Sequence, residues 1–252
     1  MPDTTLPFVP ILGVHVHAVT MPQTLAWIEA AVAARVPRQI CTANPEFVMT
    51  AQRDGEFFDL LNRADLVIPD GAGLLWAARR QGARLPERVA GSDLIYHIAE
   101  LAGKHGWRLF FLGAAEGVAE KALEILKARY PGLVAAGTFS GSPRAEENDA
   151  IVAQIKAARP DVLLVAFGAP AQDKWIARNL EQLGVPVSMG VGGSFDFVVG
   201  VVPRAPRWLQ RLNLEWLFRL WQQPRRAGRI FKAVVVFPLT FLWRGLLLKR
   251  KE

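Results

Sequence analysis

The sequence predicts an α/β fold with a Rossmann-like, largely parallel sheet, helices on both faces and a C-terminal helical appendage. Apolar runs of strand length alternate with longer helix-like segments almost to residue 200, a pattern typical of a parallel sheet covered on both sides. The chain has 252 residues and 51% apolar content, enough for a packed core. Because the alternation stops near Pro203, we expect a domain over residues 1–202 and an appendage over residues 203–252.

Three strand and helix pairs fill the first part of the domain. The run ILGVHVHAV precedes a helix that opens near Thr20 and Pro22. The run RQICTA precedes a helix from Pro45 to about Ala64, and DLVIPD precedes AGLLWAARRQG. Each apolar run has the length of a buried strand.

The second part of the domain continues the alternation. It begins with a helix over SDLIYHIAELAGKHG, and every later apolar run is again followed by a helical segment or a glycine-rich turn. The segments are, in chain order, WRLFFLG, AAEGVAEKALEILKARY, GLVAAGTFSG, EENDAIVAQIKAARP, DVLLVAFG, APAQDKWIARNLEQLG and VPVSMGVGGSF.

The basic character of the chain belongs to its C-terminal segment. The formal net charge is +7, but residues 203–252 hold 12 of the 30 Lys and Arg and carry +10, whereas residues 1–202 carry −3. A nucleic-acid-binding protein would spread its positive charge over a domain face, so we expect no nucleic-acid partner.

The same segment is rich in tryptophan and proline. It holds four of the eight Trp, and we expect two basic helical pieces divided by Pro203, Pro206, Pro224 and Pro238. Only 11 uncharged residues separate Lys232 from Arg244, fewer than the ~20 that a spanning helix needs. The pattern therefore favours an interfacial helix that lies on a membrane surface.

Cysteine usage and the N-terminus point to the cytoplasm. The single cysteine, Cys41, excludes an internal disulfide and is expected to be a small buried side chain. The start MPDTTLPFVPILG lacks the basic and apolar regions of a signal peptide. We expect a cytoplasmic protein, peripheral on the inner face of the membrane.

Polar residues at predicted strand ends suggest a ligand cleft, because ligands of open α/β sheets bind beyond the carboxyl ends of the strands. Asp70 ends the run LVIPD next to two glycines, and its alternative role is to cap the following helix. Thr42 and Asn44 offer a hydroxyl and an amide suited to sugar hydroxyls or an N-acetyl group, and their alternative role is an N-cap and turn.

Three further strand ends carry weaker signals. Gly113 ends a strand before a helix N-terminus, an arrangement that offers N–H groups to a phosphate, although the GxGxxG spacing is absent. Gln172 and Lys174 follow the strand DVLLVAFG. Asp196 follows a glycine-rich turn, where it could hold a ribose diol or only stabilise the turn. Together these ends outline a cleft for a polar, phosphate-bearing ligand.

Metal and covalent chemistry find no support in the sequence. There is no DxD pair, no GxSxG elbow and no GxxxxGK[ST] loop, and none of the four histidines lies in an HExxH motif. His15 and His17 point to one face of a strand and are expected to pack rather than bind metal. We expect no cofactor.

The appendage supplies candidate phosphate ligands. Arg219, Arg226 and Arg229 are spaced by seven and three residues, which places them on one side of a helix. Guanidinium groups bind phosphate in bidentate fashion and can stabilise a diphosphate leaving group without a metal. A solvated basic face that attracts anionic lipid is the alternative, and both roles are compatible.

Taken together, these motifs resemble the WecG/TagA/CpsF family of bacterial glycosyltransferases, glycosyltransferase family twenty-six. The resemblance runs from about residue 11 to residue 245 and rests on TANPEF, ADLVIPDGAGLLWAAR, RVAGSDL, FLGAAEGVAEKA, PDVLLVAFGAPAQDKWI, GVGGSFDFVVG and PRAPRWLQRLNLEWLFRLWQQPRR. It implies an inverting, metal-independent transfer of a sugar from a UDP-sugar donor to a polyprenyl-diphosphate-linked acceptor at the cytoplasmic membrane surface. N-acetylmannosamine, its uronic acid and hexoses such as glucose are donor sugars in the family, and the residues do not choose among them.

The resemblance also implies roles for individual residues. Asp70 becomes the general base that deprotonates the acceptor hydroxyl, with Thr42 and Asn44 beside it. The other implied contacts are Gln172 with the substrates, Asp196 with the nucleotide, Arg88 and Gly113 with the donor phosphates, and Arg219, Arg226 and Arg229 with the diphosphate.

Two other classes of function compete with this interpretation. One is a peripheral membrane-binding module in which the nucleotide fold is vestigial and Asp70 is only a cap. The other is a nucleotide-dependent oxidoreductase, which the missing GxGxxG disfavours. The sequence leaves a homo-oligomer open.

Overall fold

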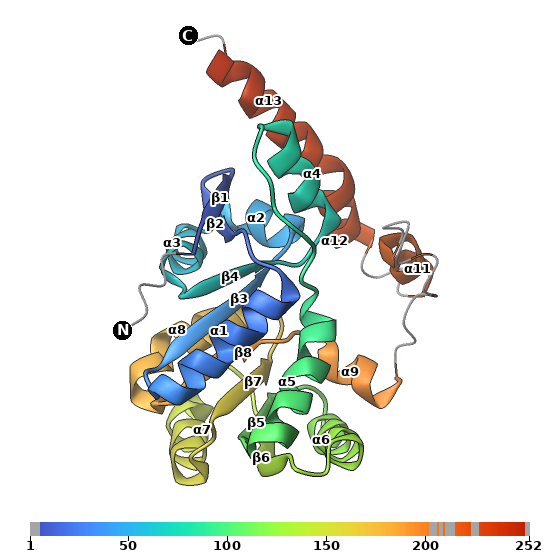
Figure 1. Ribbon diagram of the computed structural model, residues 1–252. Helices are drawn as coiled ribbons and strands as arrows, with labels where there is room; N and C mark the ends of the chain where they lie inside the picture. Colours follow the sequence, from blue (N-terminus) through green and yellow to red (C-terminus); the bar gives the residue numbers. More distant parts are fainter. Residues whose placement is uncertain (1–5, 202–205, 207–208, 210–214, 223–226, 250–252) are drawn as a thin grey trace.

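The fold is the predicted α/β arrangement, seen in a computed structural model that describes residues 6–201, 206, 209, 215–222 and 227–249 (Figure 1). Six strands pair in parallel in the order β4-β3-β8-β7-β5-β6. Their bounds are β3 Arg38–Ala43, β4 Leu66–Pro69, β5 Arg108–Gly113, β6 Val134–Phe139, β7 Val162–Ala166 and β8 Val187–Gly190.

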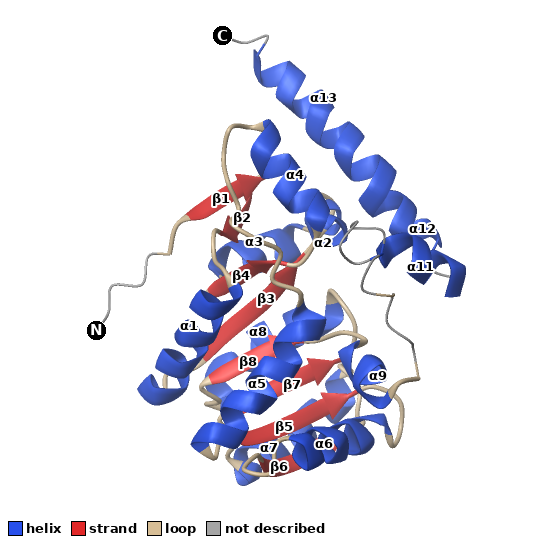
Figure 2. Ribbon diagram, turned by 45° about the vertical axis from the view of Figure 1, so that its right-hand side comes forward, coloured by secondary structure: helices blue, strands red, loops and turns tan. Residues whose placement is uncertain are grey.

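Helices cover both faces of this sheet (Figures 1 and 2). The helices of the domain are α1 Met21–Ala34, α2 Pro45–Ala51, α3 Gly55–Arg63, α4 Ala72–Arg80, α5 Gly91–His105, α6 Val118–Arg129, α7 Ala145–Ala158, α8 Ala171–Leu183 and α9 Ser194–Val199. Alternate strand residues serve opposite faces: Ile40 packs in the cluster under α1, α5, α6 and α9, whereas Cys41 and Ala43 pack in the cluster under α2, α3 and α4. This two-sided burial explains why the strands are continuous apolar runs.

The sheet has a switch point between β3 and β8. The helix that follows β3 is α2, which packs on one face, and the helix that follows β8 is α9, whose Phe195 packs on the other. The loops after these two strands therefore diverge and leave a crevice at the carboxyl edge of the sheet. Polar residues placed after β3, β4 and β8 consequently face a common space.

Two predicted elements are each divided in the structure. The run ILGVHVHAV forms a hairpin of β1 (Phe8–Ile11) and β2 (Val14–His17) outside the six-stranded sheet, because Leu12 and Gly13 both adopt positive φ and turn the chain. The predicted helix from Pro45 to about Ala64 is two helices, α2 and α3, because Asp54 caps a second start by accepting a hydrogen bond from Phe57 N–H at 3.1 Å.

The hairpin covers the end of the sheet at β4. His17 Nδ1 accepts a hydrogen bond from Val67 N–H at 2.9 Å, and burial lowers the pKa of His17, which keeps the ring neutral. His15 stacks on Phe8 with ring centroids 4.1 Å apart. Both histidines are packing residues, as predicted.

The C-terminal segment is helical over residues 215–222 and 227–249. It contains α11 (Glu215–Gln222) and a continuous helix made of α12 (Ala227–Phe231), a π-helical turn η2 (Lys232–Val236) and α13 (Phe237–Lys249) (Figure 2). The expectation that Pro238 divides two helical pieces is wrong. Proline lacks an N–H and crowds the carbonyl four residues back, and the wider π turn, in which Phe237 N–H donates to Lys232 O, absorbs this conflict.

The long C-terminal helix is packed on the domain rather than only tethered to it. Phe237 is fully buried in the cluster that also holds Leu74 of α4 and Phe47 of α2. Phe241 meets Trp76 of α4 edge to face, with ring centroids 5.7 Å apart. Among the described residues, no helix combines the length and the apolar content needed to cross a bilayer.

Candidate active site

A cavity of about 800 Å³ lies at the carboxyl edge of the sheet, over the switch point. Seven residues predicted from the sequence line it: Thr42, Asn44, Asp70, Arg88, Gln172, Asp196 and Arg229. They come from the end of β3, from the loops after β3, β4 and α4, from the first turns of α8 and α9, and from α12, so positions up to 187 residues apart in the chain share one space. A cavity of this size accommodates a ligand of several hundred daltons.

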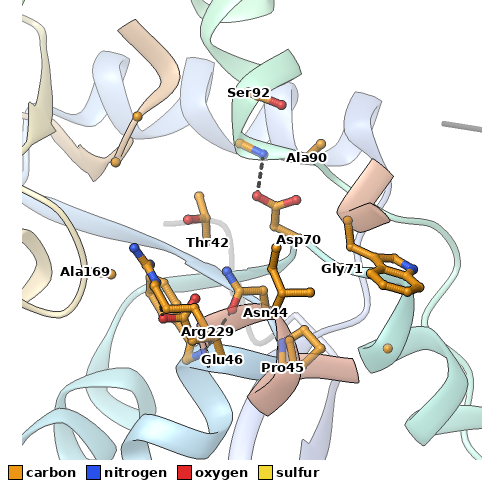
Figure 3. Close-up of a pocket in the computed structure, with 18 of the residues that line it drawn as sticks. Thr42, Asn44, Pro45, Glu46, Asp70, Gly71, Ala90, Ser92, Ala169 and Arg229 are labelled. Carbon is orange, nitrogen blue, oxygen red and sulfur yellow. Dashed lines mark hydrogen bonds and ion pairs between the residues drawn. The ribbon is translucent and has the colours of Figure 1, made fainter. Parts of the chain in front are cut away.

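Asp70 is held at the edge of the sheet by its own backbone. Its N–H donates to Ala43 O at 2.7 Å, which extends the pairing of β3 and β4 by one residue. Its side-chain Oδ2 accepts a hydrogen bond from Gly91 N–H, the first residue of α5, at 3.1 Å (Figure 3). The positive end of that helix stabilises a negative carboxylate at the cavity.

The structure corrects the capping alternative for Asp70. The helix that follows Asp70 is α4, and its cap residue, Gly71, provides no side-chain hydrogen bond. Asp70 instead meets the N-terminus of α5, a helix that starts 21 residues later and whose own cap, Ala90, has no side-chain acceptor. The carboxylate is therefore oriented by a long-range contact and lines the cavity at the same time.

Thr42 and Asn44 flank this carboxylate from β3 and its end. Thr42 is 8% exposed, and its methyl group packs against Gly91. A Cβ atom at Gly91 would lie only 2.9 Å from this methyl carbon. Asn44 caps α2 by accepting a hydrogen bond from Phe47 N–H at 3.0 Å. The predicted N-cap role of Asn44 is confirmed, and the residue lines the cavity as well (Figure 3).

The glycines after Asp70 allow the N-termini of α4 and α2 to pack closely together. A Cβ atom at Gly71 would lie 2.9 Å from Pro45 Cδ, and one at Gly73 would lie 2.6 Å from Pro45 Cγ. Both distances are shorter than carbon atoms tolerate, so only glycine lets α4 approach α2 here. This approach brings Asp70 and Asn44, at the ends of neighbouring strands, to the same wall of the cavity.

Gln172 joins two loops of the cavity. Its Oε1 accepts hydrogen bonds from Gly168 N–H at 3.1 Å and from Gly192 N–H at 2.9 Å, and the residue is 1% exposed. A Cβ atom at Gly190 would collide with Gln172 Nε2, so β8 must end on a glycine. The sequence did not indicate the role of Gly190, because no neighbouring residue shows that the distant side chain of Gln172 packs against it.

Behind Gln172 lies a buried carboxyl group that sequence reasoning missed. Asp173 has no exposed surface, and burial raises its pKa from 3.8 to about 7. Its neighbour Lys174 points elsewhere, with Nζ 2.8 Å from Asp54 Oδ2 and 2.6 Å from Glu56 Oε2. Lys174 therefore links α8 to α3 and does not line the cavity.

Of the remaining predicted residues, Gly113 is the one that the described structure places away from the cavity lining. Gly113 has φ +89° and lies against β7, where a Cβ atom would be 2.8 Å from Phe167 Cδ1, so packing explains the glycine. Arg219 belongs to α11, but its side chain lies outside the described part of the structure. Arg226 lies outside the described residues.

The C-terminal helices form one wall of the cavity. Trp216 of α11 and the helix residues Arg229, Ile230, Ala233, Val234 and Pro238 all line it. Arg229 Nε lies 2.5 Å from Oε1 of Glu46, in the first turn of α2. Glu46 is a third residue that sequence reasoning missed, although it stands inside the motif TANPEF.

The chemical capacity of the site follows from these groups. A carboxylate at a helix N-terminus can accept a proton from a hydroxyl, and a guanidinium on the wall formed by the C-terminal helices can meet an anionic ligand. In the part of the chain that is described, His, Cys, Asp and Glu form no group of three that could hold a metal ion.

Comparison with known proteins places these features in a family. The family described as "Glycosyl transferase WecG/TagA/CpsF family" matches residues 9–251. A protein of Bacillus subtilis (strain 168) is 36% identical over 203 residues, which cover 81% of this chain and 78% of the relative. A protein of Staphylococcus aureus (strain MW2) is 33% identical over 231 residues, 91% of this chain and 90% of the relative. Both relatives are called N-acetylglucosaminyldiphosphoundecaprenol N-acetyl-beta-D-mannosaminyltransferase.

Proposed function

Because the chain belongs to the WecG/TagA/CpsF family of glycosyltransferases, we propose that it moves N-acetylmannosamine from UDP to a polyprenyl-diphosphate-linked N-acetylglucosamine. The names of both relatives support this acceptor and this sugar. The reaction belongs to cell-surface polysaccharide synthesis and takes place at the inner face of the cytoplasmic membrane, with inversion at the anomeric carbon and without a metal ion.

The observation that carries the proposal is the position of Asp70. Its carboxylate sits at the end of β4, in a cavity large enough for a nucleotide-sugar, and is oriented by Gly91 N–H at 3.1 Å. An acid that served only to cap α5 would not need to line a cavity. The vestigial-fold alternative leaves this placement, and the cavity itself, without a reason.

The proposed reaction is a single displacement. The acceptor hydroxyl attacks the anomeric carbon, its proton passes to Asp70, and the bond from that carbon to the UDP oxygen breaks, so that UDP leaves with the electron pair. Thr42 and Asn44 orient the reacting sugars, and Asp196 meets the ribose of the donor. Arg229 stabilises the negative charge on the diphosphate, the task that a divalent cation would otherwise perform.

Membrane association is supported by the outer side of the C-terminal helix. Phe231 is 57% exposed, and Leu239 and Trp243 are each 63% exposed, although Phe237 on the same helix is fully buried. The segment also carries a net charge of +10. Apolar side chains that enter the headgroup region, together with basic residues that attract anionic lipid, are the two components of peripheral binding.

The proposal is tested by the variant Asp70→Asn, which removes a proton acceptor and almost no volume. We expect transfer to fall by ~10²- to 10⁴-fold, the usual loss for a general base. UDP affinity, measured by calorimetry, should stay within a few-fold of the wild-type value. The exposed Asp59 on α3 gives a matched control, since Asp59→Asn should change neither quantity. Near-full turnover by Asp70→Asn would remove Asp70 from the mechanism.

A further inference from the structure

The contact between Glu46 and Arg229 joins the domain to the wall formed by the C-terminal helices. Glu46 lies in the first turn of α2, one residue after Pro45, and Arg229 lies on α12, 183 residues later. Arg229 Nε donates to Glu46 Oε1 at 2.5 Å, and both side chains line the cavity (Figure 3). The first turn of a helix is a favourable position for a carboxylate, which suits Glu46 to this place on α2.

The geometry of this pair leaves one side of the guanidinium for a ligand. Glu46 takes the Nε position, and within the described residues Arg229 has no other hydrogen-bond or ionic partner. The edge formed by Nη1 and Nη2 carries two parallel donors, the arrangement that binds a phosphate in bidentate fashion. An arginine fixed through Nε presents this edge in one orientation, whereas an unfixed arginine would sample many.

The contribution of the Glu46–Arg229 ion pair to the stability of the fold is too small to explain why the pair is present. The side chain of Arg229 is 50% exposed and that of Glu46 is 27% exposed, and exposed ion pairs contribute little to the stability of a fold. The docking of the C-terminal helix has a stronger cause in the buried ring of Phe237. Fixing the orientation of Arg229 at the cavity is therefore the effect that the contact can deliver.

We propose that Glu46 is a positioning residue, which holds Arg229 by Nε so that its Nη edge meets the diphosphate of a substrate. This inference rests on the proposed function, in which Arg229 binds that diphosphate. It also predicts the opposite of what charge alone would predict for the removal of Glu46. If Glu46 acted only as a negative charge beside an anionic ligand, its removal would tighten binding.

The test measures the binding of two diphosphate ligands, one that represents the donor and one that represents the acceptor. One arm titrates UDP by calorimetry, and the other measures KM for a farnesyl-diphosphate-linked N-acetylglucosamine at saturating donor. In the arm whose diphosphate contacts Arg229, we expect Glu46→Ala to weaken binding by about fivefold, the size of an exposed charge pair. Glu46→Gln keeps an acceptor oxygen at the same reach and should lose less than Glu46→Ala does.

A double-mutant cycle separates positioning from other roles. In an Arg229→Gln background, Glu46→Ala should have no further effect, because there is no guanidinium left to orient. Glu56 gives a matched control: it also lies in the first turn of a helix and pairs with a cation, Lys174, but it does not line the cavity. Glu56→Ala should leave both binding measurements unchanged.

Four results would overturn the inference. Tighter binding by Glu46→Ala would make Glu46 a competitor of the diphosphate. An equal loss in the Arg229→Gln background, or a matching fall in melting temperature, would make its role independent of Arg229. If Arg229→Gln itself changed neither arm, the diphosphate role of Arg229 would fail along with the inference, whereas the role of Asp70 would still be decided by its own variant.

Discussion

Removing the ring of Phe237 should release the C-terminal helix from the domain without unfolding the sheet. The side chain is fully buried, and a Cβ atom at Gly73 of α4 would lie only 3.7 Å from its ring. Phe to Ala substitutions in cores cost about 3–5 kcal/mol. Because α13 packs on α2 and α4, most of the cost should appear in the docking equilibrium of this helix. That is a shift of about 10²- to 10³-fold toward the undocked helix.

Hydrogen exchange and turnover measure the two consequences of Phe237→Ala. The amides of α13 should exchange faster by about that factor, while those of β3 and β8 in the middle of the sheet keep their protection. Transfer to a water-soluble, short-chain acceptor should fall, because the wall that contains Trp216 and Arg229 leaves the cavity. Loss of exchange protection in β8 as well would show that helix and sheet unfold as one unit.

Leu239 provides the matched control on the same helix. It is 63% exposed, so Leu239→Ala should leave docking and soluble turnover unchanged and weaken binding to anionic liposomes. The reasoning fails if Phe237→Ala keeps wild-type turnover on the soluble acceptor, because the C-terminal wall would then be unnecessary for the reaction. It also fails if the two variants behave alike.

Two further predictions concern the metal and the buried acid. We expect transfer to continue in excess EDTA because Arg229 can neutralise the leaving diphosphate; strict dependence on added Mg²⁺ or Mn²⁺ would contradict this. Asp173, with a pKa of about 7 in the folded protein, stays protonated at pH values where the unfolded chain, with its ordinary value of 3.8, has lost that proton. Its contribution to the free energy of unfolding therefore falls as pH rises between these two values, by about 1.4 kcal/mol per pH unit, and is level above the folded pKa. Urea melts should show Asp173→Asn gaining stability relative to wild type from pH 5 to pH 7, and parallel profiles would exclude this ionisation.

The layers of the fold were predictable because local signals agree with the global structure. Strands buried on both faces read as continuous apolar runs, and each is followed by a helix, so the parallel sheet follows from the sequence. The hairpin of β1 and β2 was missed because its turn residue, Leu12, is apolar and hides a left-handed backbone inside an apolar run. The break between α2 and α3 did carry a signal, since Asp54 and Gly55 interrupt the helix pattern with a cap.

Position in the fold predicted the site where its residues follow strand ends, whereas Arg88 entered through the family resemblance and Arg229 through the spacing of the appendage arginines. Asp70, Asn44 and Asp196 could be placed together because the carboxyl ends of parallel strands meet at one edge of the sheet. Glu46 and Gly190 could not, because their roles depend on partners far away in the chain: Arg229 for one and Gln172 for the other. A contact across 183 residues leaves no trace in the periodicity of either segment.

The C-terminal helix combines three roles, on the surface, in the core and at the cavity, which its sequence alone does not distinguish. Its composition indicated a surface helix, and the exposed Leu239 and Trp243 agree with that. However, Phe237 lies in the core of the domain and Arg229 lines the cavity, so the helix has three differently used sides. The π turn before Pro238 contributes to this arrangement, because an extra residue in one turn rotates everything after it relative to everything before it. In the proposed function, a helix that docks through Phe237 and meets the bilayer through Leu239 also holds Arg229 at the cavity, where it meets the diphosphate of the leaving UDP. Soluble turnover and liposome binding therefore respond to different sides of the same helix, and substitutions on each side can separate them.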